Sequence, residues 1–330
     1  MDNEVYQLNY QTTSATSGLV DKLGKTRRGF TNLNVPKPNV DVSKYTTIFE
    51  YCKNFCTSYN MKKILISIAA LVMLCVTCGS LINGGIVSAG SALLATSPDP
   101  VINWGLTPNS REVTPEAPKG GAELLRKHGG MFVCDANAEA GEKKVYFTFD
   151  LGYEAGFTGA VLDILKENGI KATFFLCGNY LQEDELVGRM ISEGHTIGNH
   201  TDRHKDLPRL GFDAMRKDIK DFDEKFYAKF GEVYGKKMTQ FRPPQGRFNE
   251  KVLKEVADQG MKTMMWSIAI VDWGKTAIPV KPNADKIAKR IHPGAIILFH
   301  ITNSSMPEIL KQLIPQLQER GYSIGDAGSL

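Results

Sequence analysis

The strongest constraint on the fold is an alternation of strand-like and helix-like segments that runs from Lys144 to Arg320. Lys144–Asp150 and Lys171–Cys177 are largely apolar runs, as expected for strands that are covered on both faces. Between them, Thr158–Asn168 has apolar residues at helical spacing and is followed by a glycine, as a helix C-terminus often is. Such β–α alternation predicts an α/β fold built on a parallel sheet, either open or closed.

The alternation continues to the end of the chain. We expect further helices at 122–128, Glu183–Ser192, Asp213–Phe230, Asn249–Gln259, Asp285–Ile291 and Met306–Arg320. We expect further strands at Thr196–Gly198, Gln240–Pro243, Thr263–Ile268 and Ala295–His300. Polar side chains recur at or just after the strand ends, and they are Asp150, Asn199, His200, Arg242, Asp272 and His300. Because barrel enzymes form their sites at the carboxyl ends of the strands, this recurrence favours a barrel.

A second constraint is a long apolar stretch near the N-terminus. No Asp, Glu, Lys or Arg occurs between Lys63 and Asp99. Roughly 20 apolar residues cross a bilayer, so 61–87 is predicted to be a single transmembrane signal-anchor helix. The lysines before it predict that residues 1–60 are cytoplasmic and that the rest of the chain is extracytoplasmic. The cell membrane is then the expected location.

Two alternatives to this anchor stay open. Met61 and the following lysines resemble the start of a signal peptide that is cleaved after Val87-Ser88-Ala89, in which case the rest of the chain is secreted. A buried core helix is the other alternative, although a globular helix rarely lacks a polar face.

Composition divides the remainder of the chain. Residues 1–60 are polar and without periodicity, which predicts disorder. The five prolines of 88–121 indicate an extended connector, and 122–330, where the pattern becomes regular, is the expected folded domain. The formal charge of +4, without a long basic run, gives no support for nucleic-acid binding. The spacing of Cys52 and Cys56 is a weak metal or redox motif, and a disulfide between Cys134 and Cys177 is conceivable.

The segment H-T-D-R-H places His200 and His204 four residues apart. On a helical turn, residues i and i+4 share a face, so the two imidazoles could converge on one metal ion. An isolated H-x-x-x-H is weak evidence, but three of the six histidines of the chain lie at or just after strand ends. The pair is therefore a candidate set of metal ligands.

The remaining strand-end residues complete a hydrolytic set. Asp150 could act as a general base toward a water molecule, and Arg242 could orient that carboxylate through an ion pair. His300 suits a general acid, because its ordinary pKa lies near physiological pH. Each residue taken alone has a structural alternative: a helix cap for Asp150, a salt bridge for Arg242 and a core histidine for His300. Their shared position at one end of the sheet favours a common site.

Five segments occur in a recognisable order, and they are T-F-D-L-G-Y-E, G-H-T-I-G-N-H-T-D-R-H, F-R-P-P-Q-G, V-D-W and H-P-G-A-I-I-L-F-H. Together they resemble the five motifs of the polysaccharide deacetylases, the NodB-homology esterases that remove N-acetyl groups from amino sugars. The resemblance covers about residues 140–325. It implies a deformed (β/α) barrel of the polysaccharide deacetylase type with a divalent metal at its mouth.

The resemblance also implies a role for each motif residue. Asp150 would be the catalytic base and His300 the acid that protonates the leaving amine. Arg242 would steady Asp150, and Asp272 would help to fix either the arginine or the histidine. The metal would be held by His200 and His204. The backbone amide near Gln245 would form part of an oxyanion hole.

Within this family the chain is most similar to the muramic-acid deacetylases of spore-forming bacteria, through Asn103–Gly105, Gly152–Thr158 and Trp266–Trp273. That branch acts on cortex peptidoglycan glycan strands and prepares muramic δ-lactam. Functional coupling to a muramoyl-alanine amidase would follow. An inactive glycan-binding relative, or a deacetylase for N-acetylglucosamine in peptidoglycan or chitin, are the alternatives.

Leu151 departs from the family pattern, in which a second Asp follows the catalytic Asp and completes a metal triad. A leucine side chain cannot coordinate a metal ion. The expectation is therefore a weakly held divalent cation with two protein ligands, His200 and His204. Zinc, cobalt, nickel and manganese all suit such a site.

Overall fold

A computed structural model describes residues 99–107, 112–274 and 276–330. The segments predicted at 1–60 and 61–87, and the cysteine pair Cys52 and Cys56, lie outside these described residues. Within the described ranges, none of the helices has the length and apolar character that crossing a bilayer requires. The location of the protein therefore stays a prediction.

The centre of the fold is a parallel sheet whose strands follow the order β7-β5-β4-β3-β2-β9-β8, with β10 paired to β2. Each ladder within this sheet is parallel, as the β–α alternation predicted. The strands are β2 (Lys144–Leu151), β3 (Thr173–Leu176), β4 (Thr196–Asn199), β5 (Gln240–Phe241), β7 (Lys262–Thr263), β8 (Ile268–Ala269), β9 (Ile296–His300) and β10 (Ser323–Gly325).

The sheet is curled rather than fully closed. Its two edge strands, β7 and β8, are consecutive in the chain, and in the part that the structure describes no ladder joins them. The segment before α4 crosses this gap instead: Met131 forms a parallel bridge with Met264, and Val133 an antiparallel bridge with Ala295. The single strand predicted at Thr263–Ile268 is wrong, because the chain changes partner between these positions and forms two short strands.

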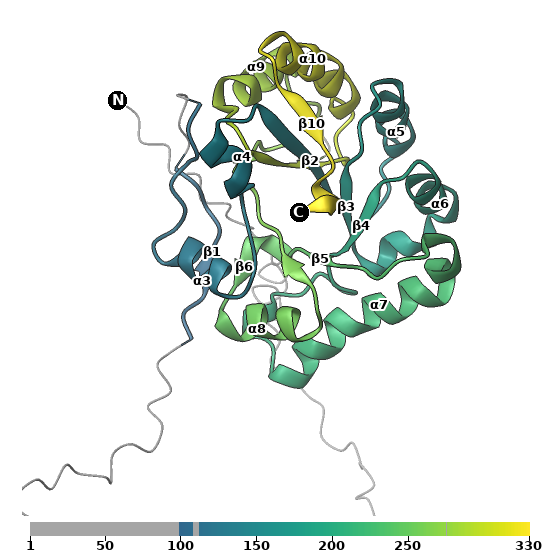
Figure 1. Ribbon diagram of the computed structural model, residues 1–330. Helices are drawn as coiled ribbons and strands as arrows, with labels where there is room; N and C mark the ends of the chain where they lie inside the picture. Colours follow the sequence, from purple (N-terminus) through teal and green to yellow (C-terminus); the bar gives the residue numbers. More distant parts are fainter. Residues whose placement is uncertain (1–98, 108–111, 275) are drawn as a thin grey trace, which may run out of the picture. The chain divides into compact units, whose positions relative to one another are not determined.

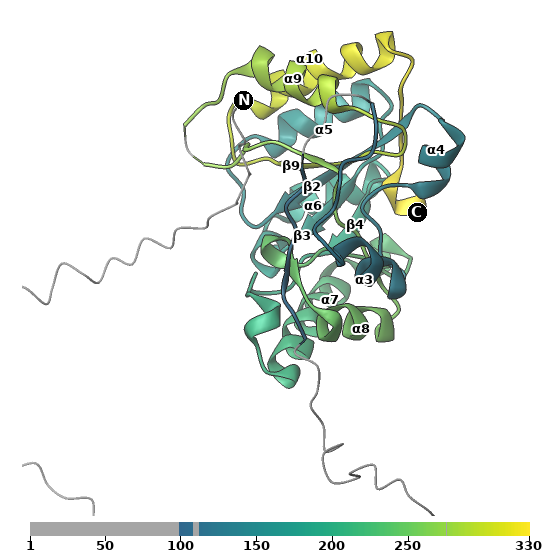
Figure 2. The same ribbon diagram turned by 90° about the vertical axis from the view of Figure 1, so that its left-hand side faces the viewer.

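Helices surround the curled sheet (Figure 1, Figure 2). They are α3 (Gly121–Lys127), α4 (Asp135–Ala140), α5 (Thr158–Glu167), α6 (Asp184–Ser192), α7 (Phe212–Tyr234), α8 (Glu250–Asp258), α9 (Val280–Arg290) and α10 (Met306–Glu319). In the part of the chain that the structure describes, short 3₁₀ helices connect elements: η2 (Gly178–Gln182), η3 (Leu207–Arg209), η4 (Pro244–Gly246) and η5 (Ala327–Ser329). The helices predicted from periodicity are confirmed to within a few residues at each end, except that α9 begins five residues early. The short helix α4 and strand β10 were not predicted.

The two faces of β2 pack against different neighbours, because successive strand residues point to opposite sides. Phe147, Phe149 and Leu151 belong to the main core between the sheet and its helices. Tyr146 lies in a smaller cluster inside the curl, with Phe175, Met264, Ile296 and Ala327. The inner face of β2 continues through Thr148 to Asp150, so it carries the chain's polar residues toward the strand end.

Part of the predicted connector packs on the catalytic domain. Strand β1 (Ile102–Asn103) pairs with β6 (Arg247–Phe248), and the side chain of Trp104 is buried in a second core cluster. The carboxylate of Asp99 accepts hydrogen bonds from the first backbone amides of α8. The domain boundary at 121 stays a prediction, but Asp99–Trp104 contribute to the folded unit.

The disulfide considered between Cys134 and Cys177 is wrong, since both are free thiols. Cys134 immediately precedes α4, whereas Cys177 follows β3 and lies next to the candidate site. The Sγ of Cys177 donates to the backbone oxygen of His200 at 3.4 Å.

Candidate active site

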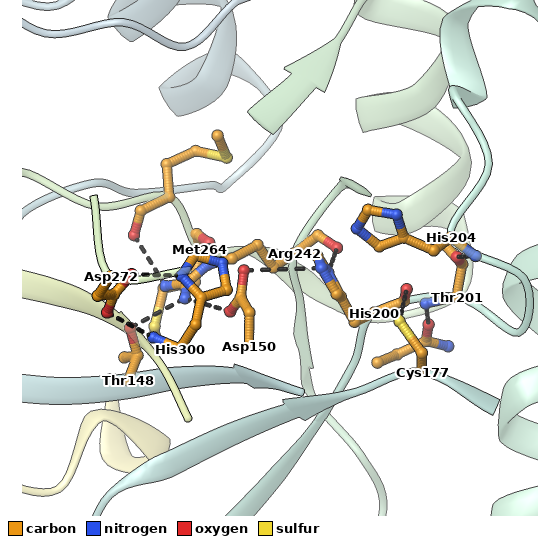
Figure 3. A network of polar contacts seen from close by, with 12 residues as sticks. Thr148, Asp150, Cys177, His200, Thr201, His204, Arg242, Met264, Asp272 and His300 are labelled. Carbon is orange, nitrogen blue, oxygen red and sulfur yellow. Dashed lines mark hydrogen bonds and ion pairs between the residues drawn. The ribbon is translucent and has the colours of Figure 1, made fainter. Parts of the chain in front are cut away.

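The strand ends bring Asp150 and His300 together. The two residues are register partners in the ladder between β2 and β9, and partners in a parallel ladder point to the same face. Figure 3 shows both side chains among the polar residues gathered at this end of the sheet. The predicted general base and general acid therefore lie side by side.

A buried ion pair holds Asp150 in place. Its Oδ1 accepts a hydrogen bond from Nη1 of Arg242 at 2.8 Å, and the same Nη1 donates to Oγ1 of Thr148 at 2.9 Å. Asp150 is 7% exposed and Arg242 is fully buried. Because only Oδ1 is engaged by the guanidinium, Oδ2 remains on the side of the site, 3.6 Å from Nε2 of His200.

The guanidinium of Arg242 is fixed on every side. Its Nε donates to the backbone oxygen of Met264 at 2.8 Å, and its Nη2 donates to that of Met265 at 3.2 Å. The ring of Phe175 lies 4.1 Å from its central carbon, and that of Trp266 lies at 5.7 Å. An arginine so enclosed can orient one carboxylate oxygen with little freedom of its own.

The surroundings of Asp150 favour its ionised form. Burial on its own would raise the pKa of this carboxyl. The nearby Arg242, followed by His200 and His300, outweighs burial and holds the pKa of Asp150 below its ordinary value. An ionised carboxylate with one free oxygen is able to accept a proton.

Asp272 pairs with His300 rather than with Arg242. Nδ1 of His300 donates to Oδ1 of Asp272 at 2.8 Å, and the backbone amide of His300 donates to Oδ2 at 2.7 Å. Burial lowers the pKa of His300, but the charge and the hydrogen bond of Asp272 exceed that effect and raise it above the ordinary value. With Nδ1 held by Asp272, the Nε2–H is the group left for proton donation.

His200 and His204 also converge, with ring centroids 5.0 Å apart. They do so on a turn after β4 and not on the helical turn that was expected. Thr201 and His204 both have positive φ angles, 66° and 52°, and the amide of His204 donates to Oγ1 of Thr201 at 3.0 Å. This left-handed turn brings the second imidazole back toward the first.

The histidine pair fits a divalent cation. Nδ1 of His200 donates to the backbone oxygen of Arg242 at 2.8 Å, which leaves the lone pair of Nε2 facing Oδ2 of Asp150. Burial, with His200 as a further cause, lowers the pKa of His204 to about 4. Burial also lowers the pKa of His200. Metal ligation needs neutral imidazoles, which the lowered pKa values favour, and the two rings are close enough to share one cation.

The described residues contain no group of three or more His, Cys, Asp or Glu side chains with metal-binding geometry. Leu151 is fully buried in the core between sheet and helices, on the face of β2 opposite Asp150. It pairs in register with Leu176, which belongs to the same cluster. The leucine therefore packs as a core residue and does not project into the site.

The R-P-P-Q-G segment forms η4 with strained backbone at its centre. Gln245 has a φ of 61°, which residues other than glycine seldom adopt. Gly246 follows with a φ of 61°, and a Cβ there would lie 2.6 Å from Trp266. The backbone of Trp104 donates to the oxygen of Gly246 at 2.8 Å, so the connector clamps this turn.

Sequence reasoning missed several residues that build the site. Thr148, Phe175 and Trp266 contact the guanidinium of Arg242, and two methionine carbonyls accept from it. The period of two on β2 could have indicated Thr148, which shares a face with Asp150. Backbone carbonyls carry no sequence signal.

Together these groups can hydrolyse an amide. Asp150 can accept a proton from water, and His300 can donate one to a departing amine. The two groups lie on neighbouring strands, with a metal-compatible histidine pair beside the base. The thiol of Cys177 lies nearby, but burial raises its pKa and its Sγ donates to the backbone oxygen of His200. Direct attack by water is therefore the chemistry that the set supports.

Comparison with known proteins agrees with this geometry. Residues 137–264 match the family model described as polysaccharide deacetylase. The chain is 35% identical over 241 residues to the peptidoglycan-N-acetylmuramic acid deacetylase PdaA of Bacillus subtilis, covering 72% of this chain and 89% of that protein. It is 35% identical over 184 residues to a peptidoglycan-N-acetylglucosamine deacetylase of Bacillus cereus, covering 54% of this chain and 64% of that protein.

Solved structures give the same result. The structure of Bacillus subtilis PdaA, a family 4 carbohydrate esterase, superimposes with a TM-score of 0.64 and covers 71% of this chain and 97% of that one. A family 4 pseudoenzyme from Bacillus anthracis is 31% identical, with a TM-score of 0.51, and the match covers 57% of this chain and 65% of that one. The site, the family match and the extent of the similarity to PdaA agree: this chain belongs to the polysaccharide deacetylase family and is a deacetylase hydrolase.

Proposed function

We propose that this protein removes the N-acetyl group of N-acetylmuramic acid in peptidoglycan glycan strands and releases acetate. The observation that carries the proposal is the register pairing of Asp150 with His300, beside the imidazoles of His200 and His204. The substrate class is supported by the 35% identity to a relative named as a peptidoglycan-N-acetylmuramic acid deacetylase.

Asp150 accepts the proton of the attacking water. Its Oδ2 is the oxygen directed into the site, because Arg242 holds Oδ1. Arg242 also keeps the pKa of Asp150 low against the effect of burial, so the carboxylate is ready as a base near neutral pH. Thr148 helps to orient the arginine, because its Oγ1 accepts a hydrogen bond from Nη1 of Arg242.

His300 donates a proton to the nitrogen that leaves. Asp272 raises the pKa of His300, which increases the imidazolium fraction at neutral pH. The same carboxylate fixes the ring, so that its Nε2–H is the group available for donation. Breaking the amide then releases a free amine rather than a strongly basic amide anion.

His200 and His204 would hold a divalent cation, and deacetylases of this family are generally metal-dependent. When bound, such an ion polarises the acetamide carbonyl and lowers the pKa of a water molecule. Zinc is the first candidate for two imidazoles, and cobalt, nickel or manganese also suit them. With two protein ligands, we propose that the ion is weakly held.

Exposed aromatic side chains suit a glycan. Tyr153, three residues after Asp150, is 57% exposed, and Trp273, next to Asp272, is 40% exposed. Aromatic faces of this kind stack on sugar rings.

We propose that the catalytic domain works outside the cytoplasm, either anchored by 61–87 or secreted. We propose that its product is the precursor of muramic δ-lactam in spore cortex. An amidase that removes the stem peptide would then act in the same series of reactions.

The substrate can be tested by mass spectrometry. Glycan strands treated with the enzyme are digested to disaccharides, and fragmentation locates the free amine. The proposal expects the amine on muramic acid. An amine on glucosamine would favour the second candidate, a deacetylase for N-acetylglucosamine, which the similarity to the Bacillus cereus enzyme supports.

A further inference from the structure

The loop that carries the two histidines, His200–His204, is attached to α7 by two ion pairs of opposite direction. Both carboxylate oxygens of Asp202 accept from Nζ of Lys225, at 2.6 and 2.7 Å. Nε of Arg203 donates to Oδ1 of Asp218 at 2.8 Å. An acid of the loop thus meets a base of the helix, and a base of the loop meets an acid of the helix.

The attachment extends to the backbone. The amide of Asp202 donates to the backbone oxygen of Asp218 at 3.0 Å, and the amide of Gly178 donates to the oxygen of Asp202 at 3.1 Å. A Cβ at Gly178 would collide with the carboxylate of Asp202. Asp218 and Lys225 are seven residues apart, so they lie on one face of α7, about two turns from each other. Asp202 and Arg203, two of the three residues between the histidines, are therefore fixed to the helix.

The contacts with α7 can stabilise the loop in its observed conformation, which is needed because the loop backbone is strained. Thr201 and His204 adopt the left-handed conformation, which non-glycine residues keep only where their surroundings impose it. The two acids, Asp202 and Asp218, are buried, whereas their basic partners are about half exposed. A buried carboxylate that loses its partner moves toward water, and the loop would move with it.

We propose that Lys225 and Asp218 are positioning residues that preorganise the His200–His204 loop for a divalent cation. This inference rests on the proposed function, which requires that cation. Leu151 lies on the opposite face of β2, so the affinity of the pair depends on how rigidly the two imidazoles are held. The ion pairs to α7 supply that rigidity where a third ligand does not.

The experiment titrates the full-length chain with Co²⁺ and records its d–d absorption band. In Lys225→Met, the aliphatic stem is kept and the charge is lost. We expect Co²⁺ to bind about tenfold more weakly, the lower end of the range found when direct hydrogen-bond partners of metal ligands are removed. We expect Lys225→Arg to restore most of the affinity. Arg203→Met is the second variant, and it removes the ion pair with Asp218.

Lys229→Met is the matched control. Lys229 lies one turn further along α7 and pairs with Asp184, which belongs to α6 and not to the loop. Its loss should leave the Co²⁺ affinity and spectrum unchanged. The melting temperature of each metal-free variant is measured in parallel, since a purely structural role would lower it without a specific change in the spectrum.

The outcomes separate this inference from the proposed function. Weaker Co²⁺ binding in Lys225→Met and Arg203→Met, with normal binding in Lys229→Met, supports the inference. Equal affinity in the unaltered chain and all four variants overturns it and leaves the proposed function intact. Absence of Co²⁺ and Zn²⁺ binding to the unaltered chain would overturn the proposed function itself, and the inference with it.

Discussion

Nη1 of Arg242 lies 2.8 Å from Oδ1 of Asp150, and neither side chain is open to solvent. The arginine is in turn held by two methionine carbonyls and enclosed by two aromatic rings. This ion pair determines both the orientation and the charge of the carboxylate. The account of catalysis depends on it.

Asp150→Asn should lower kcat by about 10²–10⁴, the usual contribution of a general base. Stability should also fall, by about 3–5 kcal/mol, because a buried guanidinium loses its counter-charge. Acetate release gives kcat, and urea unfolding gives the stability. Thr148→Val is the matched comparison, since it removes a neutral acceptor from the same guanidinium, and its effect on kcat should be much smaller. Near-normal turnover in Asp150→Asn would show that the base is another group.

Asp272→Asn should move the alkaline limb of the pH–rate profile to lower pH. His300 must be protonated to act as the acid, so activity falls as the pH rises through its pKa. Asp272 raises that pKa against the effect of burial, and without its charge the pKa decreases. The kcat/KM profile of the variant gives the shift. Asp285→Asn, at a partly exposed residue of α9 that pairs with Lys281, is the control and should leave the profile unchanged. An alkaline limb that stays in place would mean that His300 is not the acid.

Leu151 is predicted to matter for stability and not for metal binding. Leu151→Ala should cost about 2–5 kcal/mol of unfolding free energy, the usual effect of a cavity in a core. Leu151→Met, which conserves volume, should cost less than about 1.5 kcal/mol. The Co²⁺ affinity of both variants should equal that of the unaltered chain. Tighter Co²⁺ binding by Leu151→Asp would contradict this, because it would place position 151 among the ligands.

Trp104→Ala tests the contribution of the connector. The indole is buried, and Trp104 donates from its backbone to Gly246 and from Nε1 to the oxygen of Trp266 at 2.9 Å. Its truncation should cost about 3–5 kcal/mol. A fall in kcat should accompany it, since the indole that seats the connector against the strained turn at Gln245 is lost. Phe212→Ala, at a residue that is 45% exposed, should change neither quantity appreciably. An unchanged kcat in Trp104→Ala would mean that the turn does not depend on the connector.

Much of the fold follows from periodicity in the sequence. The amphipathic pattern of α5 and the apolar run of β3 depend on local spacing, and the structure has both close to their predicted positions. The change of partner between β7 and β8 could not be predicted. It depends on Met131 and Val133, which cross the gap of the curled sheet from a distant part of the chain.

The candidate site divides in the same way. Asp150 and His300 could be brought together from sequence, because both end parallel strands of one sheet. The choice of Asp272 as the partner of His300, rather than of Arg242, could not be made, since it depends on the path of the chain after β8. Leu151 could be identified as a departure from the family pattern, but its packing in the helix-side core is visible only in the structure.

The most direct test of the central claim is acetate release from peptidoglycan glycan strands that lack stem peptides. The unaltered chain and Asp150→Asn are assayed with Zn²⁺ or Co²⁺ and again with a chelator. The account predicts acetate from the unaltered chain with metal, and a loss of about 10²–10⁴ in rate in Asp150→Asn. Absence of acetate under every metal condition, while the chain still binds the glycan, would contradict it.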